Sequence, residues 1–90
     1  MNKSQLIDAV AAKSGLTKAD TEKTYKAIVE TITEEMGKGE QITLIGFGTF
    51  LVRDRKARVG RNPRTGKPLE IAASKVPAFR AGKALKDAVN

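Results

Sequence analysis

The sequence contains no cysteine, no histidine and no tryptophan, and aromatic residues make up only 4% of its 90 residues. Without cysteine there is no disulfide, and without cysteine and histidine the usual ligands of a structural zinc site are missing. The three serines, Ser4, Ser14 and Ser74, also lack the histidine that most often serves as their general base. The sequence therefore predicts no catalytic residue, no metal and no cofactor, and we expect no small-molecule substrate.

Two other patterns that carry chemistry are absent. The carboxylates on the predicted helices stand among lysines, as on solvated helix faces; they are Asp8, Asp20, Glu22, Glu30, Glu34 and Glu35. The glycines on either side of Phe47 match neither the GxxxxGK[ST] phosphate loop nor the GxGxxG dinucleotide motif, so they predict a turn.

Long apolar runs are missing as well. Residues 1–15 hold no apolar stretch of the length of a signal peptide, and no run approaches the length of a membrane span. We therefore expect a cytoplasmic protein without a membrane partner.

What the chain does have is positive charge concentrated in one segment. Residues 53–76 hold eight basic and two acidic residues, while the other 66 residues hold nine basic and eight acidic ones. Because this segment has few large apolar side chains, it cannot bury a face of its own, so its partner is expected to be a polyanion.

The remaining residues are few for an independent core. A chain of roughly 60 residues buries only about 60% of its unfolded surface, and small domains then need a disulfide, a metal or a partner chain. With the first two excluded, self-association remains, and a homodimer is its commonest form. The sequence predicts a dimer.

Apolar spacing predicts two helices near the N-terminus. Leu6, Ile7, Val10 and Ala11 mark a helix from about residue 3 to Lys13, with Asn2 or Ser4 as its cap and Gly15 as its end. A second helix follows, with a Thr17–Asp20 capping box and an apolar stripe, and ends at Gly37 or Gly39; the stripe is Tyr25, Ile28, Val29, Ile32 and Met36. The short linker between them predicts a helical hairpin.

Strand signals follow the hairpin. Residues 41–44 alternate polar and apolar, Gly46-Phe47-Gly48 predicts a turn, and residues 49–52 read as a second strand. Alternation continues in residues 53–76, which reverse direction at residues 62–67, so this segment predicts a β-ribbon with its turn at Pro63–Gly66. Residues 83–89 predict a short closing helix. The fold class is α+β.

The basic ribbon is predicted to be a DNA-binding arm. Its legs of about 11 residues reach roughly 35 Å, close to the roughly 34 Å of one turn of B-DNA. The cations alternate with strand-type residues, and guanidinium groups suit phosphates and narrow minor grooves. Contacts with phosphates or the minor groove are therefore expected for Arg53, Arg55 and those of Lys56, Arg58, Arg61, Arg64 and Lys67 that are exposed. Aromatic residues are too few for a single-strand stacking platform, so duplex DNA is the favoured partner.

Pro63 at the turn has two interpretations. It can simply preset the backbone of the turn, or its rigid apolar ring can enter between base pairs and kink the duplex. The spacing of the residues does not decide between them.

Three segments resemble one family: GFGTF at 46–50, GRNPRTGK at 60–67 and VPAFRAGKALKDAVN at 76–90. Together with the MNKSQLID start, they are similar to the HU family of bacterial histone-like DNA-binding proteins over the whole chain. The resemblance implies one domain over residues 1–90 that forms an intertwined homodimer or a heterodimer with a related subunit. Helices form its base beneath a three-stranded sheet, residues 1–52 and 77–90 form the dimerisation body, and residues 53–76 form the protruding arm.

The resemblance also implies roles for individual residues. Pro63 is the intercalating tip, a mechanism known for minor-groove architectural proteins of this family. Contacts with DNA along the tip, arm and saddle are implied for Arg53, Arg55, Arg58, Arg61, Asn62, Arg64, Lys67 and Lys75. Body contacts with flanking DNA are implied for Lys3, Lys18, Arg80, Lys83 and Lys86. The dimer core is expected to contain Ile32, Leu44, Phe47, Phe50 and Phe79.

Two positions depart from the expected pattern. Val59 stands where a threonine is common, and Pro68, which cannot donate a ladder hydrogen bond, opens the return leg. The sequence therefore leaves open whether the ribbon pairs regularly next to its tip.

The implied function is a non-enzymatic architectural protein that binds duplex DNA with little sequence preference, and bends and compacts it in the nucleoid. Two alternatives remain at this point. A subunit of integration host factor type would read specific sites partly through DNA deformability, and a structural RNA-binding protein would insert the hairpin into folded RNA.

Overall fold

A computed structural model describes all residues 1–90. The chain forms two compact units, Met1–Glu34 and Glu35–Asn90, which are described separately. Its helices are α1 (Lys3–Ser14), α2 (Lys18–Gly37) and α3 (Lys83–Val89). Its strands are β1 (Ile42–Leu44), β2 (Gly48–Arg55), β3 (Arg58–Arg61), β4 (Pro68–Ile71) and β5 (Ser74–Ala81).

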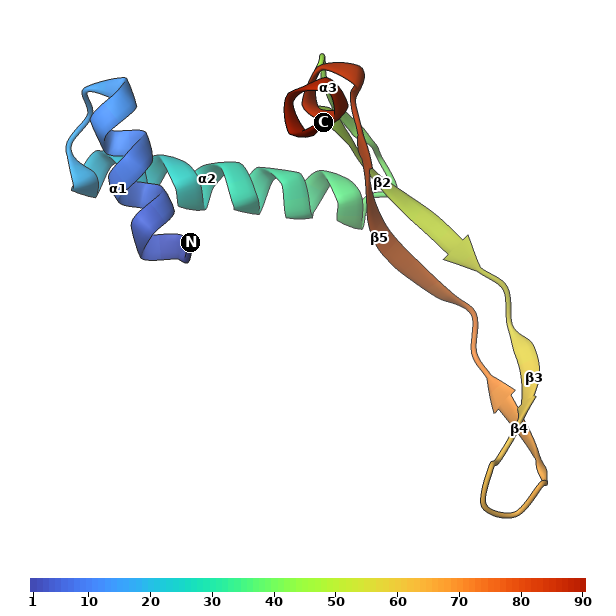
Figure 1. The fold of residues 1–90 in the computed structure, drawn as a ribbon. Coiled ribbons are helices and arrows are strands. Elements are labelled where there is room, and N and C mark those ends of the chain that lie inside the picture. Colours follow the sequence, from blue (N-terminus) through green and yellow to red (C-terminus); the bar gives the residue numbers. More distant parts are fainter. The chain divides into compact units, whose positions relative to one another are not determined.

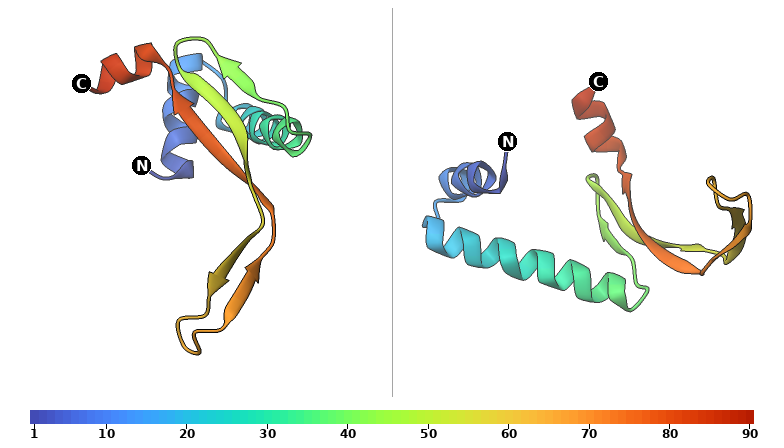
Figure 2. Two further views of the ribbon diagram at one scale, coloured as in Figure 1. Left: turned by 90° about the vertical axis from the view of Figure 1, so that its right-hand side faces the viewer. Right: turned by 90° about the horizontal axis from the view of Figure 1, so that it is seen from below.

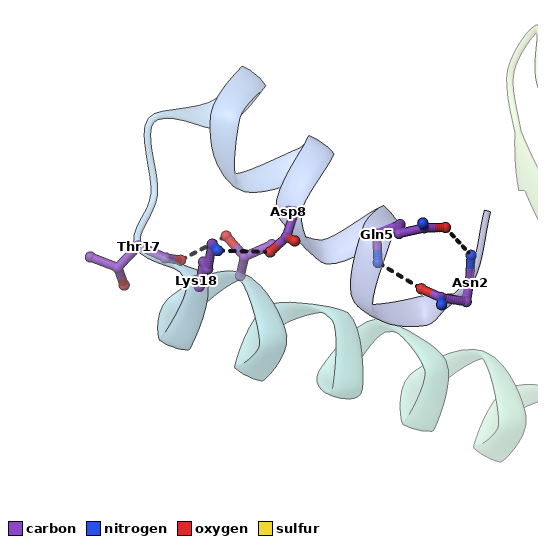
Figure 3. Close-up of polar contacts among 6 residues, drawn as sticks. Asn2, Gln5, Asp8, Thr17 and Lys18 are labelled. Atoms are coloured by element: carbon purple, nitrogen blue, oxygen red, sulfur yellow. Dashed lines mark hydrogen bonds and ion pairs between the residues drawn. The ribbon is translucent and has the colours of Figure 1, made fainter.

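Helix α1 has well-defined caps at both ends. Asn2 Oδ1 accepts from the backbone N–H of Gln5 at 2.9 Å, and Gln5 Oε1 accepts from the N–H of Asn2 at 3.0 Å (Figure 3). This reciprocal pair satisfies two N–H groups that a helix start leaves without partners. At the other end Gly15 adopts φ 76° and donates to the carbonyl of Ala11, a conformation that glycine adopts without strain.

Helix α2 begins at a second cap and packs against α1 within the first unit. Thr17 Oγ1 accepts from the N–H of Asp20 at 3.1 Å, which is one half of the predicted capping box; the reciprocal bond from the Thr17 N–H to the Asp20 carboxylate is not formed. Ile7, Ala11 and Thr21 are buried between the two helices. The Thr21 hydroxyl is satisfied because it donates to the carbonyl of Thr17 at 2.8 Å. The predicted helical hairpin is confirmed.

The second unit is built on an antiparallel three-stranded sheet with the order β1-β2-β5 (Figure 1). The tight turn between β1 and β2 contains Gly46 at φ 84°. Two backbone hydrogen bonds join this turn to the start of α3: Gly82 N–H donates to the carbonyl of Phe47 at 2.8 Å, and Leu85 N–H donates to that of Gly46 at 3.2 Å. The closing helix is thus fixed to the turn of the sheet.

Three phenylalanines gather on this sheet. The ring centroid of Phe79 lies 4.9 Å from that of Phe50 and 5.6 Å from that of Phe47, both in tilted arrangements, as aromatic pairs prefer. Gly48 is buried. It lies against the Phe79 ring so closely that a Cβ at this position would clash with the ring. Gly48 is therefore required for space, whereas Gly46 is required for its backbone conformation.

The sheet continues into the predicted ribbon. β2 pairs with β5 as far as Arg55 opposite Ser74, and β3 pairs with β4 from Arg58 opposite Ile71. The register is the same on both sides, so no residue bulges out, but the ladder is interrupted at residues 56–57 and 72–73. The ribbon bends at this level (Figure 2). Three of the four residues there are alanines, so little side-chain packing opposes the bend.

The ribbon pairs regularly at Pro68, a point that the sequence left open. Pro68 pairs with Arg61 in regular antiparallel register. The neighbouring Asn62 N–H donates to the carbonyl of Lys67 at 2.9 Å, which makes Arg61–Pro68 a pair of the kind that exchanges no hydrogen bonds of its own. The sequence left the pairing open because residue types do not specify which of the two kinds of pair contains the proline.

Little of the apolar surface is buried in a single chain. Ile7 and Ala11 are the only buried apolar residues, and no large side chain is fully buried. Phe47 and Phe79 remain 49% and 41% exposed. None of the helices combines the length and apolar character that crossing a membrane would require.

Candidate nucleic-acid interface

The arm presents its cations to solvent without internal partners. All eight basic side chains of residues 53–76 are exposed. The ion pairs of the protein are Lys3–Glu22, Lys18–Asp8 and Lys38–Glu35, so none of them uses an arm cation. A phosphate that approaches the arm therefore meets cations that no carboxylate holds.

The strands distribute these cations over both faces of the ribbon. Side chains of directly paired residues share a face, and successive residues alternate between faces. Arg53 and Arg55 in β2 thus lie on one face, with Lys75 on the other opposite Asp54. Because both faces carry positive charge, the ribbon suits a groove with phosphates on two sides.

Beyond the bend, each face of the ribbon carries one arginine beside apolar residues. Arg58 shares its face with Gly60, Leu69 and Ile71, while Arg61 shares the other with Val59, Pro68 and Glu70. The Ile71 side chain lies over Gly60, where an added Cβ would come within 3.1 Å of Ile71 Cδ1. Both faces therefore join an arginine to apolar side chains, and only the face of Arg61 also carries a carboxylate, that of Glu70.

Residues 62–67 form a closed loop at the end of the arm (Figure 1). Gly66 N–H donates to the carbonyl of Asn62 at 2.8 Å, and Gly66 takes φ 69°. Pro63, Arg64 and Lys67 are all exposed. The predicted turn is confirmed, and it presents the Pro63 ring at the tip, as a wedge requires; the contacts of these residues with DNA remain a prediction.

Lys56 lies at the bend of the arm and is one of the lysines and arginines predicted to contact phosphates if exposed. Its side chain is exposed and forms no ion pair. The structure thus leaves Lys56 available to a phosphate, and the contact stays a prediction.

The predicted contacts of the first unit, Lys3 and Lys18, behave differently, because each forms an ion pair with a carboxylate. Lys18 Nζ lies 3.2 Å from Asp8 Oδ1 (Figure 3). Lys3 Nζ lies 3.6 Å from Glu22 Oε1 and 5.5 Å from the centre of the Tyr25 ring. The two lysines and their two carboxylate partners line an open groove between α1 and α2. A phosphate must compete with carboxylates to reach either lysine.

Removal of one of these carboxylates is expected to strengthen binding. In Asp8→Asn, Lys18 loses its partner at 3.2 Å, and we expect about twofold to fivefold tighter binding to a duplex long enough to reach the body. Titration by fluorescence anisotropy with long and short duplexes measures this, and the short duplex should show no gain.

Glu35→Gln is the matched control. It makes the same charge change and breaks the Lys38–Glu35 pair of 3.3 Å, yet Lys38 is not a predicted contact. An equal gain in both variants would show that net charge alone matters and that Lys18 has no place at the DNA.

The remaining predicted body contacts belong to the second unit. Arg80 lies on β5 opposite Thr49, and Lys83 and Lys86 lie on the short helix α3. All three side chains are exposed, and none forms an ion pair. They are free to contact flanking DNA, and that role stays a prediction.

The predicted dimer-core residues fall into two groups. The structure brings Phe47, Phe50 and Phe79 together in one cluster, with Leu44 on the adjacent strand β1 and 44% exposed. Ile32 lies on α2 in the other unit and is half-buried. Apolar residues exposed to this degree are expected where a second chain completes the core.

Comparisons with known proteins agree with this geometry. The family model described as bacterial DNA-binding protein matches residues 1–90. The chain is 58% identical to DNA-binding protein HU-beta of Escherichia coli (strain K12), with all of both chains covered. It is 61% identical to DNA-binding protein HU of Geobacillus stearothermophilus, with 99% of each covered.

A solved structure is similar as well. The chain matches Anabaena HU, seen in a cocrystal with DNA, with a TM-score of 0.90, 49% identity, and coverage of 99% of this chain and 97% of that one. The similarity in sequence and fold extends over the full length of the chain. It agrees with the exposed basic arm, the closed loop at its tip and the exposed apolar core residues. The chain belongs to the HU family of bacterial DNA-binding proteins.

Proposed function

We propose that the protein is an architectural protein that binds duplex DNA with little sequence preference, and bends and compacts it in the bacterial nucleoid. The observation that carries this function is the arm: eight exposed cations, none of them ion-paired, on a ribbon that ends in an exposed proline. Cations at phosphates provide affinity that does not depend on sequence. The protein acts through binding and not through catalysis, and its place is in the cytoplasm on the nucleoid.

The working unit is a dimer. The first unit exposes 40–54% of the apolar side chains Leu6, Val10, Leu16, Ile28 and Val29, and the second leaves its phenylalanine cluster half open. A chain that buries so little apolar surface has little stability to spare. We assign residues 1–52 and 77–90 to the dimerisation body and residues 53–76 to the arm, so each dimer brings two arms to the duplex.

Low sequence specificity follows from the shape of the arm. A two-stranded ribbon with Arg and Lys contacts phosphates and the minor groove, where the pattern of donors and acceptors distinguishes A·T from G·C and little more. No recognition helix accompanies it. The relatives named above are HU proteins, and they give the integration host factor alternative no support.

The test is the salt dependence of binding by Arg61→Ala. Arg61 is exposed beside the tip and opposite Pro68. Without its guanidinium, the slope of log K against log salt should become shallower by about 0.9 for each phosphate that is no longer neutralised. We expect the affinity to fall by a similar factor on duplexes of unrelated sequence, measured by anisotropy at several salt concentrations.

Two results would contradict the proposed function. A loss of affinity confined to one DNA sequence would indicate site-specific readout. Equal or tighter binding to structured RNA, in competition with a nicked duplex, would favour an RNA-binding protein.

A further inference from the structure

The tip of the arm is held by side chains that sequence reasoning assigned to DNA or to no role. Asn62 Oδ1 accepts from the backbone N–H of Arg64 at 2.9 Å, and Thr65 Oγ1 accepts from the N–H of Lys67 at 3.3 Å. Both bonds span two residues, as in Asx and Ser/Thr turns. They enclose the turn that carries Pro63, whose fixed ring has no N–H to contribute.

Burial separates Asn62 from the rest of the loop. Residues 63–67 are all exposed, whereas Asn62 is half-buried. Its backbone is also committed: its N–H donates to the carbonyl of Lys67, and its carbonyl accepts from Gly66. Asn62 thus forms three hydrogen bonds within the loop, and its side-chain oxygen already accepts one of them in the absence of DNA.

We propose that Asn62 is a positioning residue that holds the tip loop so that the Pro63 ring projects as a wedge, and that it does not read DNA through its side-chain oxygen. This inference rests on the proposed bending function and concerns how the tip achieves it. It replaces the role implied by the family resemblance, in which Asn62 contacts DNA at the tip.

The physical reason is preorganisation. A two-stranded ribbon that extends beyond its body is marginally stable by itself, and a loop that must be ordered upon binding lowers the affinity of the complex. The bond from Arg64 N–H to Asn62 fixes the residues on both sides of Pro63 in the free protein. Without it, only a fraction of tips would carry the ring in an insertable orientation, and binding would weaken by that fraction.

The variants Asn62→Ala, Asn62→Ser and Asn62→Asp separate positioning from readout. Alanine removes the acceptor, serine restores a neutral one, and aspartate restores a stronger acceptor but adds a charge that phosphates repel. For Asn62→Ala we expect about threefold to tenfold weaker binding to intact duplex, and less bending at saturation, measured by FRET between the duplex ends.

The serine and aspartate variants should recover the bend at saturation, even though aspartate weakens affinity. A residue that donates its amide to a base edge would give the opposite result, because neither serine nor aspartate keeps that amide. If Asn62→Ser bends DNA no better than Asn62→Ala, the proposal is wrong.

A measurement without DNA distinguishes this proposal from the proposed function. In the free protein, the amide proton of Arg64 should exchange with solvent more slowly in the wild type, Asn62→Ser and Asn62→Asp than in Asn62→Ala, as followed by NMR. Equal exchange in all four would overturn the positioning role even if the wild type bends DNA. A wild type that protects Arg64 but leaves DNA straight would instead contradict the bending function.

Discussion

Gly48→Ala is expected to destabilise the protein by about 3 kcal/mol, at the upper end of what overpacking a core costs. A Cβ at Gly48 would lie 2.4 Å from Phe79 Cζ and 2.7 Å from the carbonyl oxygen of Arg80. Neither group can move away without loss of other contacts. The ring centroid of Phe79 lies 4.9 Å from that of Phe50, and Arg80 belongs to the β2–β5 ladder. Urea denaturation at one fixed protein concentration measures the change, since the stability of a dimer depends on concentration.

Gly37→Ala provides the matched control. Gly37 is the last residue of α2, has no positive φ, and would place its Cβ in open space. The same substitution there should stabilise the protein by up to about 1 kcal/mol, because alanine favours helix and restricts the unfolded chain. Equal effects at the two positions would mean that the space beneath Phe79 is not what Gly48 provides.

This contrast shows where sequence reasoning reached its limit within the fold. The helices, the strands and the tip were predictable because apolar spacing, caps and turn residues act locally, as at Asn2, Gly15 and Pro63. Gly48 was predicted as one of two turn glycines, but its role depends on Phe79, which is 31 residues further along the chain. Contacts of that kind are set by strand register, which residue types alone do not specify.

The candidate site was predictable to a similar extent. Local charge excess identified the arm, and the structure leaves all of its cations unpaired. The same charge reasoning could not show that Lys3 and Lys18 face Glu22 and Asp8, because those pairs form only once the helical hairpin brings α1 and α2 together. It also could not separate Asn62, which holds the loop, from its exposed neighbours.

Pro63 carries the second large effect. Pro63→Ala is expected to abolish most of the bend that the protein imposes on an intact duplex, while much of the affinity remains. The exposed arm cations, which supply that affinity, are unchanged, whereas the free energy of unstacking a base step, a few kcal/mol, is offset only when a rigid apolar ring fills the gap. FRET between duplex ends at saturating protein measures the bend.

Comparison of nicked and intact duplexes distinguishes a loss of ring insertion in Pro63→Ala from a general weakening of the tip. A nicked duplex is already unstacked at the nick, so Pro63→Ala should bind it nearly as well as the wild type does, and the deficit should appear on intact DNA. Pro68→Ala is the control, because it makes the same substitution in the paired β4 strand, five residues beyond the wedge. Unchanged bending by Pro63→Ala, or an equal loss with Pro68→Ala, would reduce Pro63 to a turn residue and leave the bend to arm charge alone.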